Sequence, residues 1–381
     1  MKSPFPQDWK EYTIGDCLRR VEHPVEVDSD ALYTQIGIRS HGKGLFYKEP
    51  VTGESLGSKA VYWVEPDCFI LNIVFAWEQA IGKTTQAEVG MIGSHRFPMY
   101  KPVNNLIDID YLISYLLTKR GTDILEAASP GGAGRNRTLG QDRFMKSRIV
   151  LPPLDEQQKI AEILATQDKA IELQERKIDE LKRFKKGCLE KMFPRKGQKV
   201  PEKRFPGFTG DWEQRKLGDL LQTLPFKQFL KEPEPDGKYE IIQQGNEPVI
   251  GFANGTPCGD YKDVVIFGDH TLSLYKPQHP FFVATDGVRI VKGQQDTDGY
   301  YLLSLLERYK PQSEGYKRYY SILADTNCIT TYNTSEQEKI GVFFKLLDNL
   351  ITLHQRKLDE MKKQKKALMQ LLLMGIVRVK A

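Results

Sequence analysis

The sequence predicts an α/β protein built from two strand-rich α/β domains separated by two long helices. We expect these helices to pair as an antiparallel coiled coil, with pseudo-two-fold symmetry between the halves. Three observations lead to this prediction: a long helical segment that occurs twice, a short motif that opens each half, and runs of apolar residues before each helix. We assign residues 1–154 and 198–334 to the domains, and residues 155–197 and 335–381 to the helical segments.

The helical segment is the clearest repeat in the chain. EQQKIAEILATQDKAIELQERKIDELKRFKKGCLEKMF (156–193) aligns without a gap with EQEKIGVFFKLLDNLITLHQRKLDEMKKQKKALMQLLL (336–373), and 14 of 38 positions are identical. A second pair, DWKEYTIGDCL (8–18) and DWEQRKLGDLL (211–221), opens the two halves, and a weaker pair, YLISYLL and YLLSLLE, lies inside them. A repeat of this length indicates that the chain contains one structural unit twice.

Both copies of the segment have the spacing of a coiled-coil helix. Residues at alternating intervals of four and three form a heptad seam with a few polar interruptions. Asp155 with Gln158, and Ser335 with Glu338, are typical of helix N-terminal capping. Each helix would be about 57 Å long at 1.5 Å per residue. The seam residues are Ile160, Leu164, Gln167, Ile171, Gln174, Ile178, Leu181, Lys185 and Cys188 in the first copy, and Ile340, Phe344, Leu347, Ile351, His354, Leu358, Met361, Lys365 and Leu368 in the second.

A single helix of this kind cannot bury its apolar stripe, so we expect the two copies to pair with each other. A pseudo-two-fold axis makes the pair antiparallel and puts the two domains at opposite ends of it. Gln174 and His354 occupy matching seam positions near the middle. Either the two side chains pair and fix the register, or both face solvent at a partly open seam.

Each domain is predicted to contain several strands and one helical stretch. The apolar runs are ALYTQIGI, AVYWV and CFILNIVFAW in the first domain, and KYEIIQQ, PVIGFA, DVVIFG and FFVATDGVRIV in the second, separated by Gly, Pro and Asp. Helical stretches are expected near residues 110–127 and 298–309. The order of the strands does not follow from these patterns.

Composition and motifs argue against several classes of protein. The longest apolar run, MQLLLMGIV, is too short to span a bilayer, and the polar N-terminus lacks a signal-peptide core. The five cysteines are scattered without a CxxC motif, which indicates neither a zinc site nor a disulfide framework. We therefore expect a cytoplasmic protein with no membrane segment and no metal site.

Catalytic motifs are also missing from the sequence. The chain lacks the Asn/Asp-Pro-Pro-aromatic motif expected of a methyltransferase that acts on DNA amino groups. GIRSHGKG (37–44) has the glycine spacing of a P-loop but ends in glycine, and AIGKTT (80–85) lacks the first glycine. The six histidines are isolated. These observations favour a non-catalytic protein.

This layout resembles the specificity subunit of type I restriction-modification enzymes, over essentially the whole chain. The most specific phrases are LPPLDEQQKIAEIL (151–164) with the following KIDELKRFKKGCLEKMF, and RFPGFTGDWEQRKLGDL (204–220). HGKGLF, GGAGRNRTLGQDR, IIQQGNEPVIGFAN and FGDHT also look like phrases from such subunits. The second helical copy departs from the pattern, because it begins with TSEQEKI and lacks the LPP lead.

The resemblance implies a DNA-recognition role without catalysis. Each globular domain would be a target-recognition domain that reads one half of a bipartite double-stranded DNA target, and the paired helices would set the gap. The family's subunit docks two adenine methyltransferase subunits, which use S-adenosylmethionine, and can also join two motor and nuclease subunits, which use ATP and Mg. The chain itself would hold no cofactor. The resemblance does not distinguish a restricting complex from one that only methylates. The alternative is a coiled-coil scaffold or adaptor with two protein-binding heads.

The charge distribution complicates a DNA-binding role. Residues 1–154 carry 18 basic and 18 acidic side chains, residues 201–334 carry 15 and 18, and the chain's net charge of +5 therefore lies on the helical segments. A protein that gripped DNA mainly through phosphates would be more basic. Either the domains have basic faces opposed by acidic ones, or partners supply part of the phosphate contact.

Candidate base-reading residues are polar and cationic side chains on glycine-rich loops, which suit readout in a DNA groove. Each of these loops can equally be a solvated turn. The candidates are Arg39, His41 and Lys43 in one loop, His95 and Arg96 in a second, Arg135, Asn136 and Arg137 in a third, and Gln243, Gln244, Tyr316, Lys317 and Arg318 in the second domain.

Overall fold

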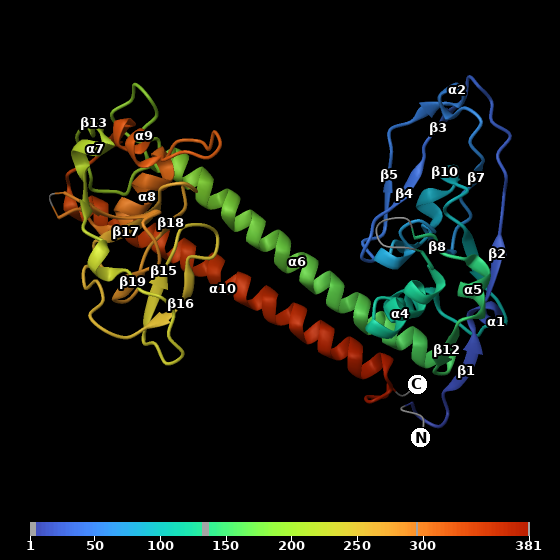
Figure 1. Ribbon diagram of the computed structural model, residues 1–381. Coiled ribbons are helices and arrows are strands. Elements are labelled where there is room, and N and C mark those ends of the chain that lie inside the picture. Colours follow the sequence, from blue (N-terminus) through green and yellow to red (C-terminus); the bar gives the residue numbers. More distant parts are fainter. Residues whose placement is uncertain (1–4, 132–136, 295, 380–381) are drawn as a thin grey trace. The chain divides into compact units, whose positions relative to one another are not determined.

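The computed structural model describes residues 5–131, 137–294 and 296–379 (Figure 1). The chain divides into two compact units. Unit 1 comprises residues 1–173 and 358–381, and unit 2 comprises residues 174–357. Because the two long helices pass from one unit into the other, each unit contains the N-terminal part of one helix and the C-terminal part of the other.

The first domain, in unit 1, is built from short strands and helices. Its elements are β1 (Lys10–Thr13), α1 (Ile14–Cys17), β2 (Leu18–Val21), β3 (Leu32–Tyr33), β4 (Ile36–Ile38), β5 (Leu45–Tyr47), β6 (Val51–Thr52), α2 (Gly53–Leu56), β7 (Val61–Trp63), β8 (Phe69–Leu71), η1 (Ala76–Glu78), β9 (Ile81–Lys83), η2 (Gln86–Glu88), β10 (Ile92–Ser94), β11 (Met99–Pro102), α3 (Ile109–Leu116), α4 (Lys119–Ala128), α5 (Gln141–Lys146) and β12 (Arg148–Leu151).

The second domain, in unit 2, follows a similar plan. Its elements are β13 (Glu213–Lys216), α7 (Leu217–Leu220), β14 (Leu221–Leu224), η3 (Lys227–Phe229), β15 (Tyr239–Ile242), β16 (Val249–Ala253), β17 (Val264–Gly268), β18 (Leu274–Tyr275), β19 (Phe281–Val283), β20 (Val288–Gly293), α8 (Gly299–Tyr309), α9 (Tyr320–Asp325) and β21 (Asn327–Thr330).

The two domains share one sheet topology, which the sequence patterns did not reveal. The four-stranded sheet has the order β2-β11-β8-β9 in the first domain and β14-β20-β17-β18 in the second, and every neighbouring pair is antiparallel. In both domains a two-stranded ladder joins the entry strand to the strand before the long helix: β1 pairs with β12, and β13 pairs with β21. The duplication therefore extends through the domains, although their sequences have diverged.

The remaining sheets differ between the domains. The second domain has a three-stranded sheet, β16-β15-β19, in which β15 and β19 run parallel. The first domain instead has the two-stranded ladders β10-β7, β3-β6 and β4-β5. The shared sheet is thus the common scaffold, and the added strands are specific to each domain.

The long helices are α6 (Leu154–Met192) and α10 (Thr334–Leu373). They begin slightly earlier than the capping patterns predicted, so Asp155 and Ser335 lie inside the first turns. The cap predicted at Ser335 is wrong, because the Asn333 side chain accepts the hydrogen bond from the Glu336 backbone N–H at 3.0 Å. Asparagine before a helix performs the same capping chemistry as serine.

The helices are antiparallel in both units, as predicted. In unit 2, the Gln174 side-chain amide donates to Nδ1 of His354 at 2.9 Å and to the His354 carbonyl oxygen at 2.8 Å. In unit 1, Lys365 donates to Asp168 at 2.5 Å. Figure 1 shows the two helices, α6 in green and α10 in orange to red, alongside each other. The polar seam pair exists, and Gln174 is buried, so the open-seam alternative is excluded.

Each domain is packed onto its helices by a large apolar cluster. In unit 1, Tyr111 and Leu116 of α3 belong to one cluster with Leu164 of α6 and Leu372 of α10. In unit 2, Phe193 has its ring centroid 5.7 Å from that of Trp212 and 5.8 Å from that of Tyr301. Trp212 comes from the DWEQRKLGDLL motif, so this repeated motif packs the start of its domain against the helices.

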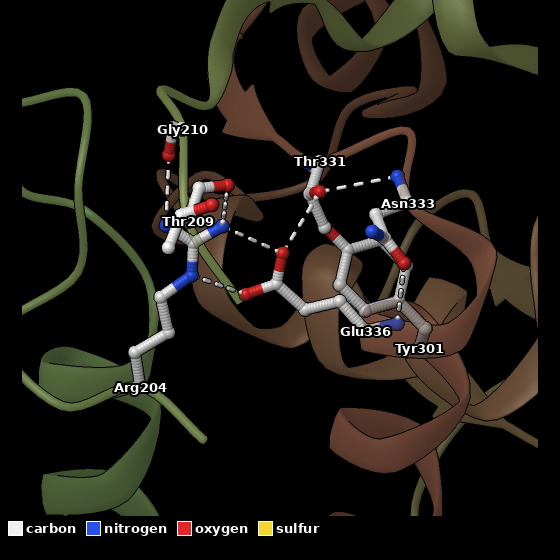
Figure 2. A network of polar contacts seen from close by, with 7 residues as sticks. All are labelled: Arg204, Thr209, Gly210, Tyr301, Thr331, Asn333 and Glu336. Carbon is white, nitrogen blue, oxygen red and sulfur yellow. Dashed lines mark hydrogen bonds and ion pairs between the residues drawn. The ribbon is translucent and has the colours of Figure 1, made fainter. Parts of the chain in front are cut away.

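A buried ion pair joins the second domain to the start of α10 (Figure 2). Arg204 donates from Nε and Nη2 to the two carboxylate oxygens of Glu336, at 2.7 and 2.9 Å. The hydroxyl of Thr331 donates to Glu336 Oε2 at 3.0 Å, and Arg204 also donates to the carbonyl oxygens of Thr209 and Gly210. The buried carboxylate is therefore fully engaged, as buried charges require.

The same joint occurs in unit 1 at the start of α6. Arg378 donates from Nε and Nη2 to the two oxygens of Glu156, both at 2.7 Å, and also to both oxygens of Asp8. Glu156 and Glu336 are equivalent residues of the repeated segment. Arg378, which follows α10, therefore makes the same contact in unit 1 that Arg204, which precedes Trp212, makes in unit 2.

Candidate nucleic-acid interface

The first candidate loop is a tight turn between β4 and β5. The Arg39 N–H donates to the Gly44 carbonyl at 3.0 Å, closing the turn. His41, Gly42 and Gly44 have φ values of 61°, 64° and 72°, a conformation that favours glycine. A side chain at Gly42 would also meet Leu117 at 2.7 Å. The glycines therefore shape a compact turn whose cationic side chains point outward.

Residues 72–80, here called the anchor segment, hold this turn in place. The backbone N–H groups of His41 and Gly42 donate to the carbonyl oxygens of Glu78 and Gln79 at 2.8 and 2.9 Å. The hydroxyl of Ser40 donates to the Glu78 carboxylate at 3.1 Å. The turn is thus fixed mainly through its backbone. The Arg39 guanidinium also donates to the Leu45 carbonyl oxygen, and the His41 and Lys43 side chains are exposed.

The second loop, Ser94 to Phe97, is held by the same segment. The Ile73 N–H donates to the Arg96 carbonyl at 3.0 Å, and the His95 N–H donates to the Ala60 carbonyl at 3.2 Å. His95 and Arg96 are exposed. This loop therefore presents its imidazole and guanidinium from a backbone tied to the anchor segment.

The third loop also reaches the anchor segment. The guanidinium carbon of Arg137 lies 5.4 Å from the centroid of the Trp77 ring, and the Leu139 N–H donates to the Ile73 carbonyl at 2.8 Å. Arg135 and Asn136 lie outside the described residues. Three loops that are far apart in sequence therefore converge on one segment of nine residues.

The basic side chains of these loops are not paired with acidic groups among the described residues. Arg39, His41, Lys43, His95 and Arg96 form no ion pair with another described residue. The Arg39 guanidinium instead lies over the Phe46 ring, 5.1 Å from its centroid. Stacking of this kind orients a guanidinium without reducing its charge.

A hollow of about 370 Å³ lies beside the second loop, and its lining includes two lysines that sequence reasoning missed. Lys48 and Lys59 stand in polar stretches with no glycine-rich pattern, so the sequence offered no signal for them. The lining residues are Gln35, Ile36, Lys48, Lys59, Val61, Asn72, Val74, Phe75, Ser94, His95, Arg96 and Phe97. We call this hollow the basic groove.

In the second domain, the two candidate glutamines are engaged in holding turns. Gln243 donates from its side chain to the Glu247 carbonyl at 3.0 Å. Gln244 accepts the backbone N–H of His270 at 3.0 Å. We therefore place Gln244 as a residue that positions the loop carrying His270.

Tyr316 is the most exposed large hydrophobic side chain among the described residues of the second domain. It is 88% exposed, and its ring stacks on His270 with centroids 4.7 Å apart and planes 4° from parallel. Nδ1 of His270 lies 3.2 Å from the Lys317 carbonyl oxygen, so the ring nitrogen donates there. His270, which is isolated from other histidines in the sequence, therefore stacks on an exposed aromatic ring and supports its orientation.

The neighbouring cations differ in availability. The Lys317 amine pairs with Glu314 at 2.6 Å, and this hydrogen bond is the largest cause of the raised pKa of Lys317. Arg318 is exposed and makes no ion pair with another described residue. Arg318 is thus free to contact a ligand, whereas Lys317 would first have to leave Glu314.

Asp269 holds the loop that carries Tyr316 in place. The buried carboxylate accepts the Tyr320 backbone N–H at 2.9 Å and lies 3.3 Å from the Arg289 guanidinium. The Asp269 carbonyl also accepts the Tyr319 N–H at 2.7 Å. The FGDHT phrase therefore ties the loop of Tyr316 to the central sheet, as the anchor segment does in the first domain.

The geometry and burial of the described residues bear on two kinds of reactive site, a metal site and a reactive thiol. They contain no cluster of three or more His, Cys, Asp or Glu side chains placed to hold a metal ion. Burial raises the pKa of Cys17 and Cys68 to about 11 and that of Cys328 to about 12, so these thiols stay protonated near neutral pH. Among the described helices, none is long and apolar enough to cross a bilayer.

Comparison with known proteins identifies the architecture. Residues 33–183 match the model of the type I restriction modification DNA specificity domain. Two proteins of Methanocaldococcus jannaschii align along the chain: the type I restriction enzyme MjaVIII specificity subunit (23% identity, 98% of this chain, 94% of the relative), and one provisionally named as the MjaX specificity subunit (24% identity, 99% and 95%).

A solved structure shows the same fold. The S subunit of a type I restriction-modification system from M. genitalium superimposes with a TM-score of 0.63 at 14% identity, and the alignment covers 98% of this chain and 99% of that one. This similarity confirms the predicted fold of two α/β domains separated by long helices. Residues 33–183 therefore match the type I restriction modification DNA specificity domain, and along its length the chain is similar to specificity subunits of type I restriction enzymes.

Proposed function

We propose that this chain is the DNA-recognition subunit of a type I restriction-modification complex, acting in the cytoplasm. Each domain reads one half of a bipartite double-stranded target, and the paired helices set the gap and dock the methyltransferase subunits. One observation carries the proposal: the same sheet occurs twice, in β2-β11-β8-β9 and β14-β20-β17-β18, each time followed by a long helix.

The side chains on the candidate reading loops differ between the two domains, which supports recognition of two different half-site sequences. In the first domain the available side chains are cationic, namely Arg39, Lys43, Arg96 and Arg137. In the second domain they are the stacked pair of Tyr316 with His270, together with Arg318. Arginine and lysine suit the acceptors of guanine in the major groove, and an aromatic ring suits apolar contact with thymine or stacking on a base. The two domains would therefore recognise unrelated sequences.

The chain's contribution to the reaction is binding and positioning. We propose that it docks two adenine methyltransferase subunits, which bring S-adenosylmethionine, and can join two motor and nuclease subunits, which bring ATP and Mg. Its own residues hold the DNA in register so that a target adenine in each half-site meets a methyltransferase. Rigid anchoring of the reading loops suits this role, because even a small misplacement of reacting groups lowers the reaction rate.

Methylome sequencing tests the proposal directly. A host that expresses the chain with its methyltransferase partner should gain methyladenine at one bipartite motif with a non-specific gap. The same host with the methyltransferase alone should lack that motif. A continuous motif, or methylation that does not depend on this chain, would show that the proposed function is wrong.

A further inference from the structure

We propose that the basic groove of the first domain binds the phosphodiester backbone of the DNA, next to the bases read by the Arg39 turn. This inference rests on the proposed function and assigns a separate task to Lys48, Lys59 and Asn72, which lie outside the predicted loops, together with Arg96 of the second loop. Lys48, Lys59 and Arg96 supply the charge, and Asn72 supplies an amide donor.

The groove is assembled from four separate parts of the chain. Lys48 follows β5, Lys59 precedes β7, Asn72 follows β8 and Arg96 lies between β10 and β11. Backbone hydrogen bonds fix these parts: the Lys48 N–H donates to the Gln35 carbonyl at 2.9 Å, and the Arg96 carbonyl accepts from Ile73. The fold therefore gathers these cations in one place.

The charge of the groove is unbalanced. Its lining contains no carboxylate, and Lys48, Lys59 and Arg96 form no ion pair with another described residue. Elsewhere in this domain cations are commonly paired, in Arg20–Glu22, Lys83–Asp110, Lys101–Glu65, Lys119–Asp123 and Arg148–Glu11. A domain with 18 basic and 18 acidic residues thus leaves positive charge concentrated in one hollow, where it attracts anions.

The polar groups of the groove are mainly donors. Asn72 is 9% exposed, and its Oδ1 already accepts the Val74 N–H at 3.0 Å. The Nδ2 group of Asn72 has no other partner among the described residues, so it remains available to donate. Ser94 Oγ accepts the Arg96 N–H. A phosphodiester has only acceptor oxygens, so a hollow that offers ammonium, guanidinium and amide donors is complementary to it.

The apolar part of the lining strengthens these interactions. Ile36 and Val61 form part of the wall, and Phe75 is 37% exposed beside them. Apolar walls lower the local dielectric, so ionic hydrogen bonds formed against them are stronger than in open water. Asn72 and Phe75 both belong to the anchor segment, which also holds the Arg39 turn. The phosphate site and the reading turn therefore keep a constant spacing.

The corresponding turn of the second domain carries a different charge. The turn before β20, which corresponds to the turn before β11, contains Thr285, Asp286 and Gly287 in place of His95 and Arg96. An acidic residue there would repel a phosphate. The phosphate site is thus assigned to the first domain. Such a site would let a domain with no net charge bind DNA.

The test is the salt dependence of DNA binding by the full chain, alone and with its methyltransferase partner. We compare wild type with the double variant Lys48→Ala/Lys59→Ala on a fluorescent duplex that carries the target. Each lost phosphate contact makes the slope of log K against log[salt] shallower by about 0.9, so the groove variant should lose about 1.8. A control variant, Lys10→Ala/Lys146→Ala, removes the same charge from exposed positions outside the groove and should keep the wild-type slope.

The outcomes separate this inference from the proposed function. The groove variant should methylate the same bipartite motif as wild type, because phosphate contacts carry no sequence information. A changed motif, or equal loss of slope in the groove and control variants, overturns the phosphate site. Competition by inorganic triphosphate that is lost in the variant, with an unchanged DNA slope, would assign the groove to a free polyphosphate instead. If wild type shows no preference for the target at all, the proposed function itself fails.

Discussion

Arg204 and Glu336 form a two-point ion pair in which the carboxylate is 1% exposed. Hydrogen bonding to the Glu336 carboxylate is the largest cause of the raised pKa of Arg204. The matching pair, Arg378 with Glu156, has the same geometry, so the duplicated segment keeps a buried glutamate wherever a domain meets its helix. The sequence around Glu336 suggested only a helix start, because its partner lies 132 residues away.

Removing Arg204 should destabilise unit 2. The substitution Arg204→Ala leaves the Glu336 carboxylate buried without its cation, which costs about 3 kcal/mol of unfolding free energy. Urea unfolding, with hydrogen exchange of unit 2 peptides, measures the loss. The matched control is Arg215→Ala, whose pair with Glu213 is about half exposed; it should change stability by less than about 1 kcal/mol. Equal effects of the two substitutions would contradict the role of the joint.

Lys276 should make unit 2 more stable at alkaline pH. Burial lowers the pKa of this amine from 10.5 to about 8, and its side chain is almost completely covered. Between pH 8 and about 10.5 the unfolded chain therefore binds a proton that the folded chain does not, and the unfolding free energy rises with pH. The rise is on the order of 2–3 kcal/mol.

The substitution Lys276→Met should remove this pH dependence, whereas Lys262→Met, at an exposed lysine, should keep it. Unfolding free energies at pH 7, 8, 9 and 10 give the two slopes. Parallel curves for wild type and Lys276→Met would show that the amine stays charged when folded.

The pair of Gln174 and His354 should fix the register of the helices. Replacing both residues with leucine removes two polar groups from the seam, so we expect a higher melting temperature but a less unique alignment. Gln174→Leu alone should lower stability, because the His354 ring nitrogen and carbonyl lose their donor. Spin labels at Lys182 and Asn349 should give one distance in wild type and a broad distribution in the double-leucine variant. A single sharp distance there would assign the register to the apolar residues instead.

Lengthening both helices equally should lengthen the gap in the DNA target. Seven residues inserted in each helix beside the Gln174–His354 pair preserve the heptad seam and add about 10.5 Å, or roughly three base pairs at 3.4 Å each. The half-site sequences should stay the same in the methylome. Inserting seven residues into α6 alone should abolish methylation, because the seams no longer match. A change in the half-site bases would mean that the helices do more than set a spacing.

Single substitutions in the reading loops should each affect one half-site. Tyr316→Ala should relax discrimination in one half of the motif, and Arg39→Ala in the other, each by about 1–3 kcal/mol at the contacted base. His270→Ala should act in the same direction as Tyr316→Ala but more weakly, because it frees the tyrosine ring without removing it. Methylation rates on duplexes mutated in one half-site measure this. If Tyr316→Ala and Arg39→Ala relaxed the same half-site, the assignment of one domain to each half would fail.

The helices were predictable because their information is local and duplicated. The heptad spacing of Leu164 or Ile340 is visible in a few turns of sequence, and the 14 identities show which two helices correspond. The equivalent positions of Gln174 and His354 suggested that the two side chains could pair, but a partly open seam was equally compatible with the sequence. The helix starts were less certain, since several neighbouring residues, including Asn333 and Ser335, can cap a helix.

The sheet and the candidate interface depend on contacts between distant residues. The ladders of β8 with β11, and of β17 with β20, join strands whose sequences no longer resemble each other. The anchor segment was read only as an apolar run, and nothing in it signals that its carbonyl groups hold the turns of His41 and Leu139. The arginine-rich loops were visible by composition, but Lys48 and Lys59 become a site only when the fold brings them beside Arg96.

The joint formed by Arg378 has a consequence for chain order. Arg378, which follows α10, contacts Asp8 and also Glu156 at the start of α6, much as Arg204 contacts Glu336 at the start of α10. The contacts at the two joints therefore do not depend on where the polypeptide backbone is continuous. A circularly permuted polypeptide, opened in the segment 194–203 and with its present ends tied by a similar linker, would make the same contacts and should fold to the same structure.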